Sequence, residues 1–336
     1  MTQVDVVDDF AQMNDEFRPE LLAHCYRMLG SIHDAEDLVQ ETYLRAWRSF
    51  DKFEGRSSVR TWLYRIATNV CLTALESRKR RPLPTDLSAT SSDPLASLVQ
   101  SPEIPWLEPA PDALVGTAPN DPATIVGSRE SIRLAFIAAL QTLPPRQRAV
   151  LVLRDVLKWR AAEVAELFDT STASVNSALQ RARAQMIEAA PTEDTIHEPT
   201  DSDQSETLER YVAAFENYDM AALVELFTED AVWQMPPYTG WYEGGDNIAR
   251  LIGHNCPADG PGDMKMVPTS ANGQPAFALY MRGEDGLHHA FQIQALTVTA
   301  TGVSHVASFF EPRLFDTFGL PQTLPDPRTV DDEAEQ

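Results

Sequence analysis

A chain of 336 residues is too long for one compact core, so its length predicts two or three packed units. Hydrophobic residues at 43% and charged residues at 23% are ordinary for a soluble globular protein, and no apolar run reaches the roughly 18 residues that span a bilayer. The N-terminus, MTQVDVVDDF, is acidic where a signal peptide is basic, and the three cysteines (Cys25, Cys71, Cys256) lack disulfide or metal spacing. We expect a multidomain, cytoplasmic protein without a metal site.

The charge is distributed unevenly along the chain. A net charge of -23 argues against nucleic-acid binding, because a DNA-binding surface displaces counterions with positive charge. Residues 1–44, however, carry two basic and ten acidic side chains, whereas residues 45–81 carry ten basic and three acidic ones. Residues 128–190 have a net charge of +3, and residues 191–336 have a net charge of -19. The two basic segments are therefore candidate DNA surfaces.

The first basic segment has the pattern of two helices. Apolar or small residues recur every three or four positions from residue 34, which predicts one buried stripe made of Ala35, Leu38, Val39, Thr42, Tyr43, Ala46, Trp47 and Phe50. A second stripe runs from Val59 to Leu75 and ends in a basic run before Pro82. Between the helices, residues 51–58 hold an aromatic side chain, a glycine, cations and two hydroxyls. Such a loop can pocket an unstacked base.

Taken singly, each of these residues is better explained by structure than by function, the aromatic residues as core and the charged residues as a solvated helix face. Together, the string DAEDLVQETYLRAWRSFDKFEGRSSVRTWLYRIATNVCLTALESRKRR resembles region 2 of sigma-70-class sigma factors, specifically the extracytoplasmic-function (ECF) group, over residues 17–81. The resemblance implies that the acidic-faced helix binds core RNA polymerase through Asp34, Asp37, Gln40 and Glu41. It also implies that the loop and next helix open the promoter -10 element through Phe53, Arg56, Ser57, Ser58, Arg60, Trp62, Arg65 and Asn69.

A second helical segment follows at residues 128–190. Its apolar spacing predicts a helix around residues 132–140, another that begins at Pro144-Pro145, and a helix-turn-helix over residues 161–186. The pattern resembles region 4 of the same family, which reads the promoter -35 element. Basic side chains usual in that family are replaced here by Asn176 and Ala178, so weaker or different -35 binding is expected. The remaining candidate DNA contacts are Thr172, Ser174, Asn176, Ser177, Gln180, Arg181 and Arg183.

Residues 82–127 have the composition of a linker. They contain six acidic residues and no Lys or Arg, with many Pro, Ser, Ala and Thr. The segment is interpreted either as a mere tether or, by the family resemblance, as a connector that threads through the RNA path of the polymerase. The predicted domains are therefore region 2 at residues 10–81, the linker at 82–127 and region 4 at 128–190.

The pattern of residues 205–325 predicts a domain of a different class, α+β. Helical patterns around residues 208–218 and 223–227 precede strand-like runs at 276–282, 288–299 and 303–310, which are separated by the turn signals Asn272-Gly273, Asp285-Gly286 and Thr301-Gly302. We expect an antiparallel meander. With the string LFTEDAVWQMPP, this order resembles the cone-shaped SnoaL-like (polyketide-cyclase-like) domains.

Domains of that shape enclose a cavity, so a small-molecule ligand is a possible partner. Its candidate lining residues are Trp233, Met235, Tyr238, Trp241, Tyr242, Phe277, Tyr280, His289 and Phe291. Equally, these aromatic residues can simply fill the cone. His254, His288 and His289 with Asp230 or Asp259 are candidates for an acid/base pair, but no spacing fixes one.

The sequence predicts a sigma factor that binds core RNA polymerase and promoter DNA, has no enzymatic activity and no cofactor, and is controlled in cis by its C-terminal domain. One alternative is a transcription regulator that uses only the helix-turn-helix, which leaves the acidic helix and the aromatic-basic loop of residues 34–70 unexplained. Another is a SnoaL-like enzyme that uses the helical part for targeting.

Overall fold

The computed structural model describes residues 3–50, 53, 55, 57–77, 79–89, 91–116, 131–189 and 201–325, without the side chains of residues 3–15 and 201. The chain forms two compact units that alternate along the sequence. The first contains residues 1–81 and 107–192, and the second contains residues 82–106 and 193–336. Within the described residues, no helix has both the length and the apolar character needed to cross a membrane.

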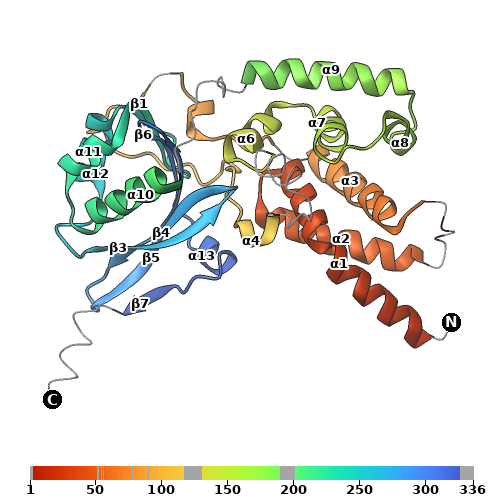
Figure 1. Ribbon diagram of the computed structural model, residues 1–336, viewed down its shortest axis with the longest axis horizontal. Helices are drawn as coiled ribbons and strands as arrows, with labels where there is room; N and C mark the ends of the chain where they lie inside the picture. Colours follow the sequence, from red (N-terminus) through yellow and green to blue (C-terminus); the bar gives the residue numbers. More distant parts are fainter. Residues whose placement is uncertain are drawn as a thin grey trace. The chain divides into compact units, whose positions relative to one another are not determined.

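Three long helices form the first part of the helical unit: α1 (Gln3–Leu29), α2 (Ile32–Ser49) and α3 (Val59–Ser77) (Figure 1). They pack against one another around the buried side chains of Leu22, Tyr26, Ile32 and Leu63. The Ser31 side chain caps α2 by accepting a hydrogen bond from the Asp34 backbone N–H at 3.1 Å. The predicted region 2 helices are confirmed.

The prediction that Trp47 belongs to the buried stripe of α2 is wrong. Its exposed fraction is 45%, whereas Ala35 and Ala46 are fully buried. At about 100° per residue, Trp47 is rotated by roughly 120° from Ala35, but Ala46 by only about 20°. The outer face of α2 therefore carries a large aromatic side chain.

The second part of the helical unit consists of α4 (Asp112–Val115), α6 (Leu134–Thr142), α7 (Pro145–Leu151), a π-helical turn η3 (Val152–Val156), α8 (Ala161–Leu167) and α9 (Thr172–Ala189). Helices α6, α7 and α8 all pack against α9. The turn between α8 and α9 contains Asp169, whose φ of 47° lies in the left-handed region. The predicted helix-turn-helix is confirmed, and its second helix extends to Ala189.

The two helical parts pack together within this unit. Helix α1 contacts α6 and α7, and α3 contacts α7. The buried Arg27 side chain donates hydrogen bonds to the Ser131 carbonyl and hydroxyl at 3.1 and 3.0 Å, and Arg148 donates to the Met28 carbonyl. Burial lowers the pKa of both arginines to about 10, and both remain cationic at neutral pH.

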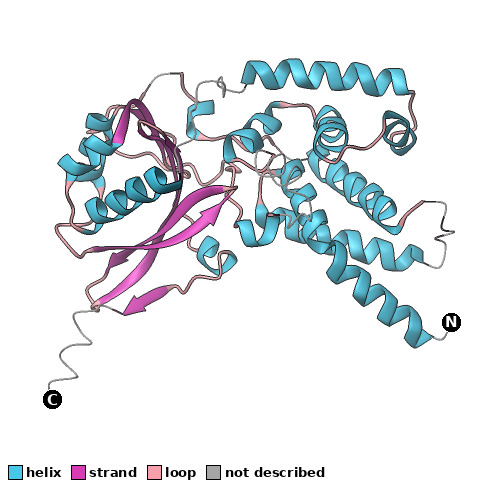
Figure 2. Ribbon diagram, viewed as in Figure 1, coloured by secondary structure: helices cyan, strands magenta, loops and turns pink. Residues whose placement is uncertain are grey.

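The second unit is built on a seven-stranded sheet (Figure 2). Its strands are β1 (Phe227–Gln234), β2 (Trp241–Glu243), β3 (Met264–Ala271), β4 (Gln274–Arg282), β5 (Leu287–Thr299), β6 (Gly302–Phe309) and β7 (Thr323–Pro325). The sheet order is β2-β1-β6-β5-β4-β3, with β7 paired to β5. Helices α10 (Asp201–Glu216), α11 (Met220–Leu226) and α12 (Gly245–Asn255) lie together on one face, and α13 (Arg313–Thr317) follows β6 (Figure 1).

The predicted antiparallel meander is confirmed for β4, β5 and β6, but it is incomplete. Strand β1 pairs with β6 in parallel, with Trp233 opposite Val306, so the sheet is mixed. A parallel neighbour requires a long crossover, and here α12 and strands β3–β5 supply it. Strands β2 and β3 and helix α12 were not predicted, although α12 is amphipathic and β3 is as long as β1.

Residues 82–106 also differ from the expected tether, because they pack on the second unit as a strap. Ser92 N–H donates to the Trp241 carbonyl at 2.7 Å, and Thr239 N–H donates to the Val99 carbonyl at 3.0 Å. A proline- and serine-rich segment has little helix or strand propensity, but its backbone groups still find partners on the edge of the domain. We call residues 82–106 the strap.

Candidate functional sites

The outer face of α2 combines acidic and apolar side chains. Asp37 and Gln40 are exposed, and Glu41 is partly exposed and accepts a hydrogen bond from Arg45 at 2.7 Å. One turn further along, Leu44 and Trp47 are exposed by 52% and 45%. Such large apolar groups beside carboxylates are typical of a protein-binding surface. Three of the four residues predicted to contact polymerase therefore share one accessible face.

Asp34, the fourth of these residues, is committed to the protein itself. Its carboxylate forms an ion pair with Arg81, and its side chain is 20% exposed. Arg81 also approaches Glu108 at 3.9 Å, and Glu108 accepts hydrogen bonds from Ser31 and His33. Although burial raises the pKa of Glu108, these hydrogen bonds outweigh it and leave that pKa below its ordinary value. The structural role of Asp34 was not visible in sequence, because its partner lies 47 residues away.

An aromatic cluster lies at the start of α3, next to the loop that precedes this helix. The Trp62 ring lies 4.8 Å from the Phe53 ring and 6.2 Å from the Phe50 ring. Both Phe53 and Trp62 are only partly buried, so part of the cluster is open to solvent. Aromatic rings with an accessible face can receive an unstacked base.

The other predicted -10 contacts divide into free and committed side chains. Ser58 caps α3 by accepting from Thr61 N–H at 3.1 Å, and Arg60 pairs with Glu20 at 2.7 Å. Arg65 pairs with Glu166 of α8 at 3.0 Å. Asn69 is exposed, Ser57 is partly buried, and Arg56 lies outside the described residues.

Helix α9 presents its predicted DNA contacts on one exposed surface. Val175, Leu179 and Ala182 are buried against the other helices. The exposed positions are Thr172, Ser174, Asn176, Ser177, Gln180, Arg181 and Arg183. This division is what a recognition helix needs, since its outer side chains must reach base edges in a major groove.

Two of these side chains already have partners. Arg181 donates to the Ser177 hydroxyl at 2.8 Å, and Arg183 forms two hydrogen bonds to the Asp155 carboxylate at 2.8 and 2.6 Å. The hydrogen bond with Asp155 raises the pKa of Arg183. Arg183 therefore braces α9 against η3, while Arg181 remains well exposed near the neutral readers.

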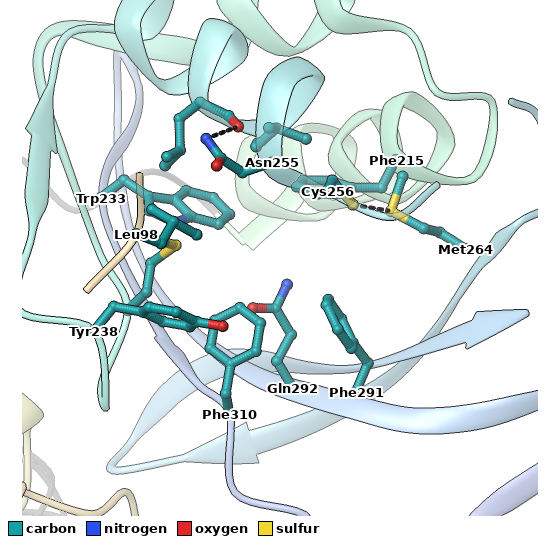
Figure 3. Close-up of a pocket in the computed structure, with 13 residues that line it drawn as sticks. Leu98, Phe215, Trp233, Tyr238, Asn255, Cys256, Met264, Phe291, Gln292 and Phe310 are labelled. Carbon is teal, nitrogen blue, oxygen red and sulfur yellow. Dashed lines mark hydrogen bonds between the residues drawn. The ribbon is translucent and has the colours of Figure 1, made fainter. Parts of the chain in front are cut away.

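The second unit contains a cavity that offers about 70 Å³ to the centres of water-sized molecules and is partly open to solvent (Figure 3). Among the predicted lining residues, Trp233, Met235, Tyr238 and Phe291 do line it. The other lining residues come from the helices, the strap and neighbouring strands: Leu98, Phe215, Leu251, Ile252, Asn255, Cys256, Met264, Gln292 and Phe310. Burial raises the pKa of the Cys256 thiol, which keeps it neutral.

The remaining lining predictions are wrong. The Trp241 indole N–H donates to the Ser88 carbonyl at 2.9 Å, and the Tyr280 hydroxyl donates to Pro321 at 2.8 Å. His289 pairs with Asp285 at 2.9 Å on the exposed β4–β5 turn. Tyr242 and Phe277 belong to the core but do not line the cavity. Strand β4 alternates without interruption, with Phe277 and Leu279 on the core side, so Tyr280 lies on the opposite face. The extra residue of the β-bulge is Phe291 in β5, and both Phe291 and Gln292 line the cavity.

The proposed acid/base partners are dispersed. His254 and Asp259 are exposed, the Asp230 carboxylate accepts from Thr228 at 2.9 Å, and His288 contacts the Gly262 carbonyl at 3.0 Å. None of the residues that line the cavity in the described part of the chain is a histidine or a carboxylate. The described residues also contain no group of three or more His, Cys, Asp or Glu that could hold a metal ion.

Comparison with protein families gives three matches along the chain. Residues 14–81 match the model of sigma-70 region 2, residues 133–186 match that of sigma-70 region 4, and residues 208–311 match that of a SnoaL-like domain. The strap lies between the first two matches and outside the third.

Individual proteins are similar over most of the chain. The ECF RNA polymerase sigma factor SigG of Mycobacterium tuberculosis is 58% identical over 317 residues, which cover 94% of this chain and 85% of SigG. SigJ of the same organism is 30% identical over 254 residues, which cover 74% of this chain and 73% of SigJ. The crystal structure of SigJ matches with a TM-score of 0.58 at 25% identity, and the match covers 93% of this chain and all of that one.

Proposed function

Because this chain belongs to the family of ECF RNA polymerase sigma factors, we propose that the faces of α2, α3 and α9 described above are its polymerase and promoter surfaces, and that its SnoaL-like domain controls them in cis. The protein is a sigma factor, with helical regions 2 and 4 and a C-terminal SnoaL-like domain. It works where the polymerase works, which we take to be the cytoplasm.

The polymerase surface is the exposed stripe of α2. Asp37, Gln40 and Glu41 supply polar and acidic groups, and Leu44 and Trp47 supply apolar area. Charges at the rim steer association, and a desolvated aromatic side chain supplies much of the affinity. Asp34 stays outside this surface because Arg81 already neutralises it.

The promoter surfaces follow the division of free and committed side chains. Phe53 and Trp62 receive an unstacked -10 base, with Asn69 exposed on the same helix. Asn176 and Gln180 read the -35 element from α9, and Arg181 contacts phosphate. Arg65 is available to DNA only when it leaves Glu166.

The observation that carries the proposal of control is the packing of region 2 against region 4 in one unit. The edge-to-face contact of Tyr64 with Trp159 at 5.9 Å and the Arg65–Glu166 ion pair join α3 to the region 4 part. On a promoter, the -10 and -35 elements lie about 25 base pairs apart, which is about 85 Å at 3.4 Å per base pair. Regions that contact each other cannot span that distance, so the unit must open for initiation.

Opening must also move the connection between the two regions. Residues 82–106 of that connection are held as the strap on the second unit, and residues 107–116 remain with the helical unit. By retaining or releasing the strap, the SnoaL-like domain sets how far regions 2 and 4 can separate. We propose binding rather than turnover as its activity, since the residues that line its cavity provide neither a histidine nor a carboxylate for acid/base chemistry.

Run-off transcription with purified core polymerase tests this function. The full chain is compared with a version that ends at residue 190 on a cognate promoter, and each is assayed with and without cell extract as a source of ligand. We expect the truncation to change transcript yield several-fold, because the strap loses its binding surface. Equal yields under both conditions would refute control in cis while leaving sigma activity intact.

A further inference from the structure

One wall of the cavity in the second unit comes from outside the SnoaL-like domain. The SnoaL-like match covers residues 208–311, whereas Leu98 belongs to the strap between regions 2 and 4. Leu98 is half-buried and lines the cavity together with Trp233, Met235 and Phe291 (Figure 3). The cavity is therefore completed by the segment that joins the two DNA-binding regions.

The strap is fixed on both sides of Leu98. Before it, the Asn255 amide, which also lines the cavity, donates to the Pro94 carbonyl at 3.2 Å. After it, Thr239 N–H donates to the Val99 carbonyl and Ser101 N–H donates to the Pro237 carbonyl, both at 3.0 Å. These bonds hold the Leu98 side chain over the cavity.

Two buried polar atoms in the lining have no hydrogen-bond partner among the residues that the structure describes. They are Nε1 of Trp233, a donor, and Oε1 of Gln292, an acceptor. The residues are 2% and 5% exposed, so bulk water does not satisfy them. Buried polar groups are nearly always paired, and an unpaired donor and acceptor in one cavity point to a ligand with complementary groups. In Figure 3 the Gln292 amide extends into the space below the Trp233 ring.

We propose that this composite cavity binds a neutral, mostly apolar small molecule that accepts a hydrogen bond from Trp233 and donates one to Gln292, and that the bound molecule holds the strap in place. The ligand is neutral because no Lys, Arg, His, Asp or Glu is among the lining residues, and it is apolar because aromatic and aliphatic side chains make up most of the wall. The inference rests on the proposed control in cis and specifies its ligand.

The coupling follows from the position of Leu98. A ligand that touches Leu98 gains contacts only when the strap is docked, so it binds the docked state more tightly and increases its population. By reciprocity, loosening the strap must weaken ligand binding by the same factor. Ligand affinity and strap docking are thus two measurements of one equilibrium.

Binding is tested on the full-length protein with 2-naphthol as the probe and naphthalene as the probe that lacks the hydroxyl. We expect 2-naphthol to bind at least tenfold more tightly, which corresponds to about 1.4 kcal/mol. Trp233→Phe and Gln292→Leu should each reduce that preference below about threefold while naphthalene affinity changes little. Circular dichroism melts of both variants check that the domain still folds.

The strap is tested with a matched pair of leucines. Leu98→Ala should weaken 2-naphthol binding about fivefold, whereas Leu95→Ala, at an exposed strap position, should leave that affinity unchanged. The strap contains no Lys or Arg, so trypsin does not cut it. It does contain Trp106 and several leucines, after which chymotrypsin can cut. We expect saturating 2-naphthol to slow chymotryptic cleavage within residues 82–106 at least threefold in the parent protein and in Leu95→Ala, and not in Leu98→Ala.

Equal affinity for both probes, no binding of either, or cleavage rates that 2-naphthol does not change would overturn the proposal. These outcomes are separable from failure of the proposed function. Run-off yields that ignore the SnoaL-like domain would remove its role in transcription, but they would leave the binding and cleavage results as they are.

Discussion

Helix α9 and the cavity of the second unit assemble their functional side chains in opposite ways. The candidate DNA contacts of α9 all lie within one helix, Thr172–Ala189, and the helical repeat alone separates them from the buried side. The cavity instead draws Phe215 from α10, Trp233 from β1, Asn255 from α12, Gln292 from β5 and Leu98 from the strap. A surface made by one helix tolerates changes elsewhere, whereas a composite cavity depends on contacts distant in sequence.

Helix α2, like α9, carries its candidate binding residues on a single helix. The largest effect is expected from charge reversal on α2. Asp37→Lys combined with Glu41→Lys should lower affinity for core polymerase at least about 30-fold, because placing like charges opposite each other across an interface costs several kcal/mol. Fluorescence anisotropy of labelled protein titrated with core polymerase measures this affinity.

A control for that variant is available on another helix. Glu206→Lys with Glu209→Lys makes the same charge change at exposed positions of α10 and should leave core affinity within about twofold. Similar losses in both double variants would mean that net charge, rather than the α2 face, governs binding.

Promoter opening should depend on the aromatic cluster before α3. Trp62→Ala removes the ring that packs against Phe53, and stacking of a base on an aromatic ring is worth about 1–3 kcal/mol. We expect roughly tenfold less open complex by permanganate reactivity at the -10 element, with unchanged core affinity. Undiminished reactivity would place base capture elsewhere.

The sequence predicted which side chains of α9 are buried and which are exposed, because that division depends on local periodicity. Buried Val175, Leu179 and Ala182 and exposed Asn176 and Gln180 follow directly from a 3.6-residue repeat. The same repeat failed at Trp47, where the stripe drifts around α2. It also gave no hint that Asp34 is held by Arg81, because tertiary ion pairs leave no periodic signal.

The cavity was predictable only in part. Trp233, Met235 and Phe291 were found from their aromatic or apolar character, but Tyr280 and His289 were assigned to it wrongly. Strand alternation predicts two faces of β4 but not which one the helices cover, and in β5 a bulge at Phe291 exchanges the faces on either side of it. The sequence could not predict that Leu98 lines the cavity, since no local feature of a proline-rich segment indicates the domain on which it docks.

A smaller effect is expected at the recognition helix. Gln180→Ala should weaken binding of the -35 element about fivefold, because it removes one polar reader and leaves the fold untouched. Glu188→Ala, exposed near the end of the same helix, serves as its control. Electrophoretic mobility shifts with matched and scrambled -35 sequences should show the loss on the matched sequence alone; a uniform loss would assign Gln180 to the DNA backbone.

The smallest effect concerns the ion pair that joins α3 to α8. Glu166→Ala frees Arg65, and an exposed pair contributes about 0.2–1 kcal/mol. We therefore expect core-binding rates to rise by no more than about fivefold, and less at high salt. A larger or salt-independent increase would mean that this single contact dominates closure of the unit.

The alternation of the two units along the chain also orders events during synthesis. The strap leaves the ribosome before any of the domain that it will cover, and about two hundred further residues must follow before residue 311 is made. The helical regions are complete at residue 189, and at roughly 5–20 residues per second they can fold for roughly 6–24 seconds before residue 311 is made. Each newly made molecule therefore passes through a stage in which its strap has no docking partner, and slow translation of the C-terminal codons would lengthen that stage.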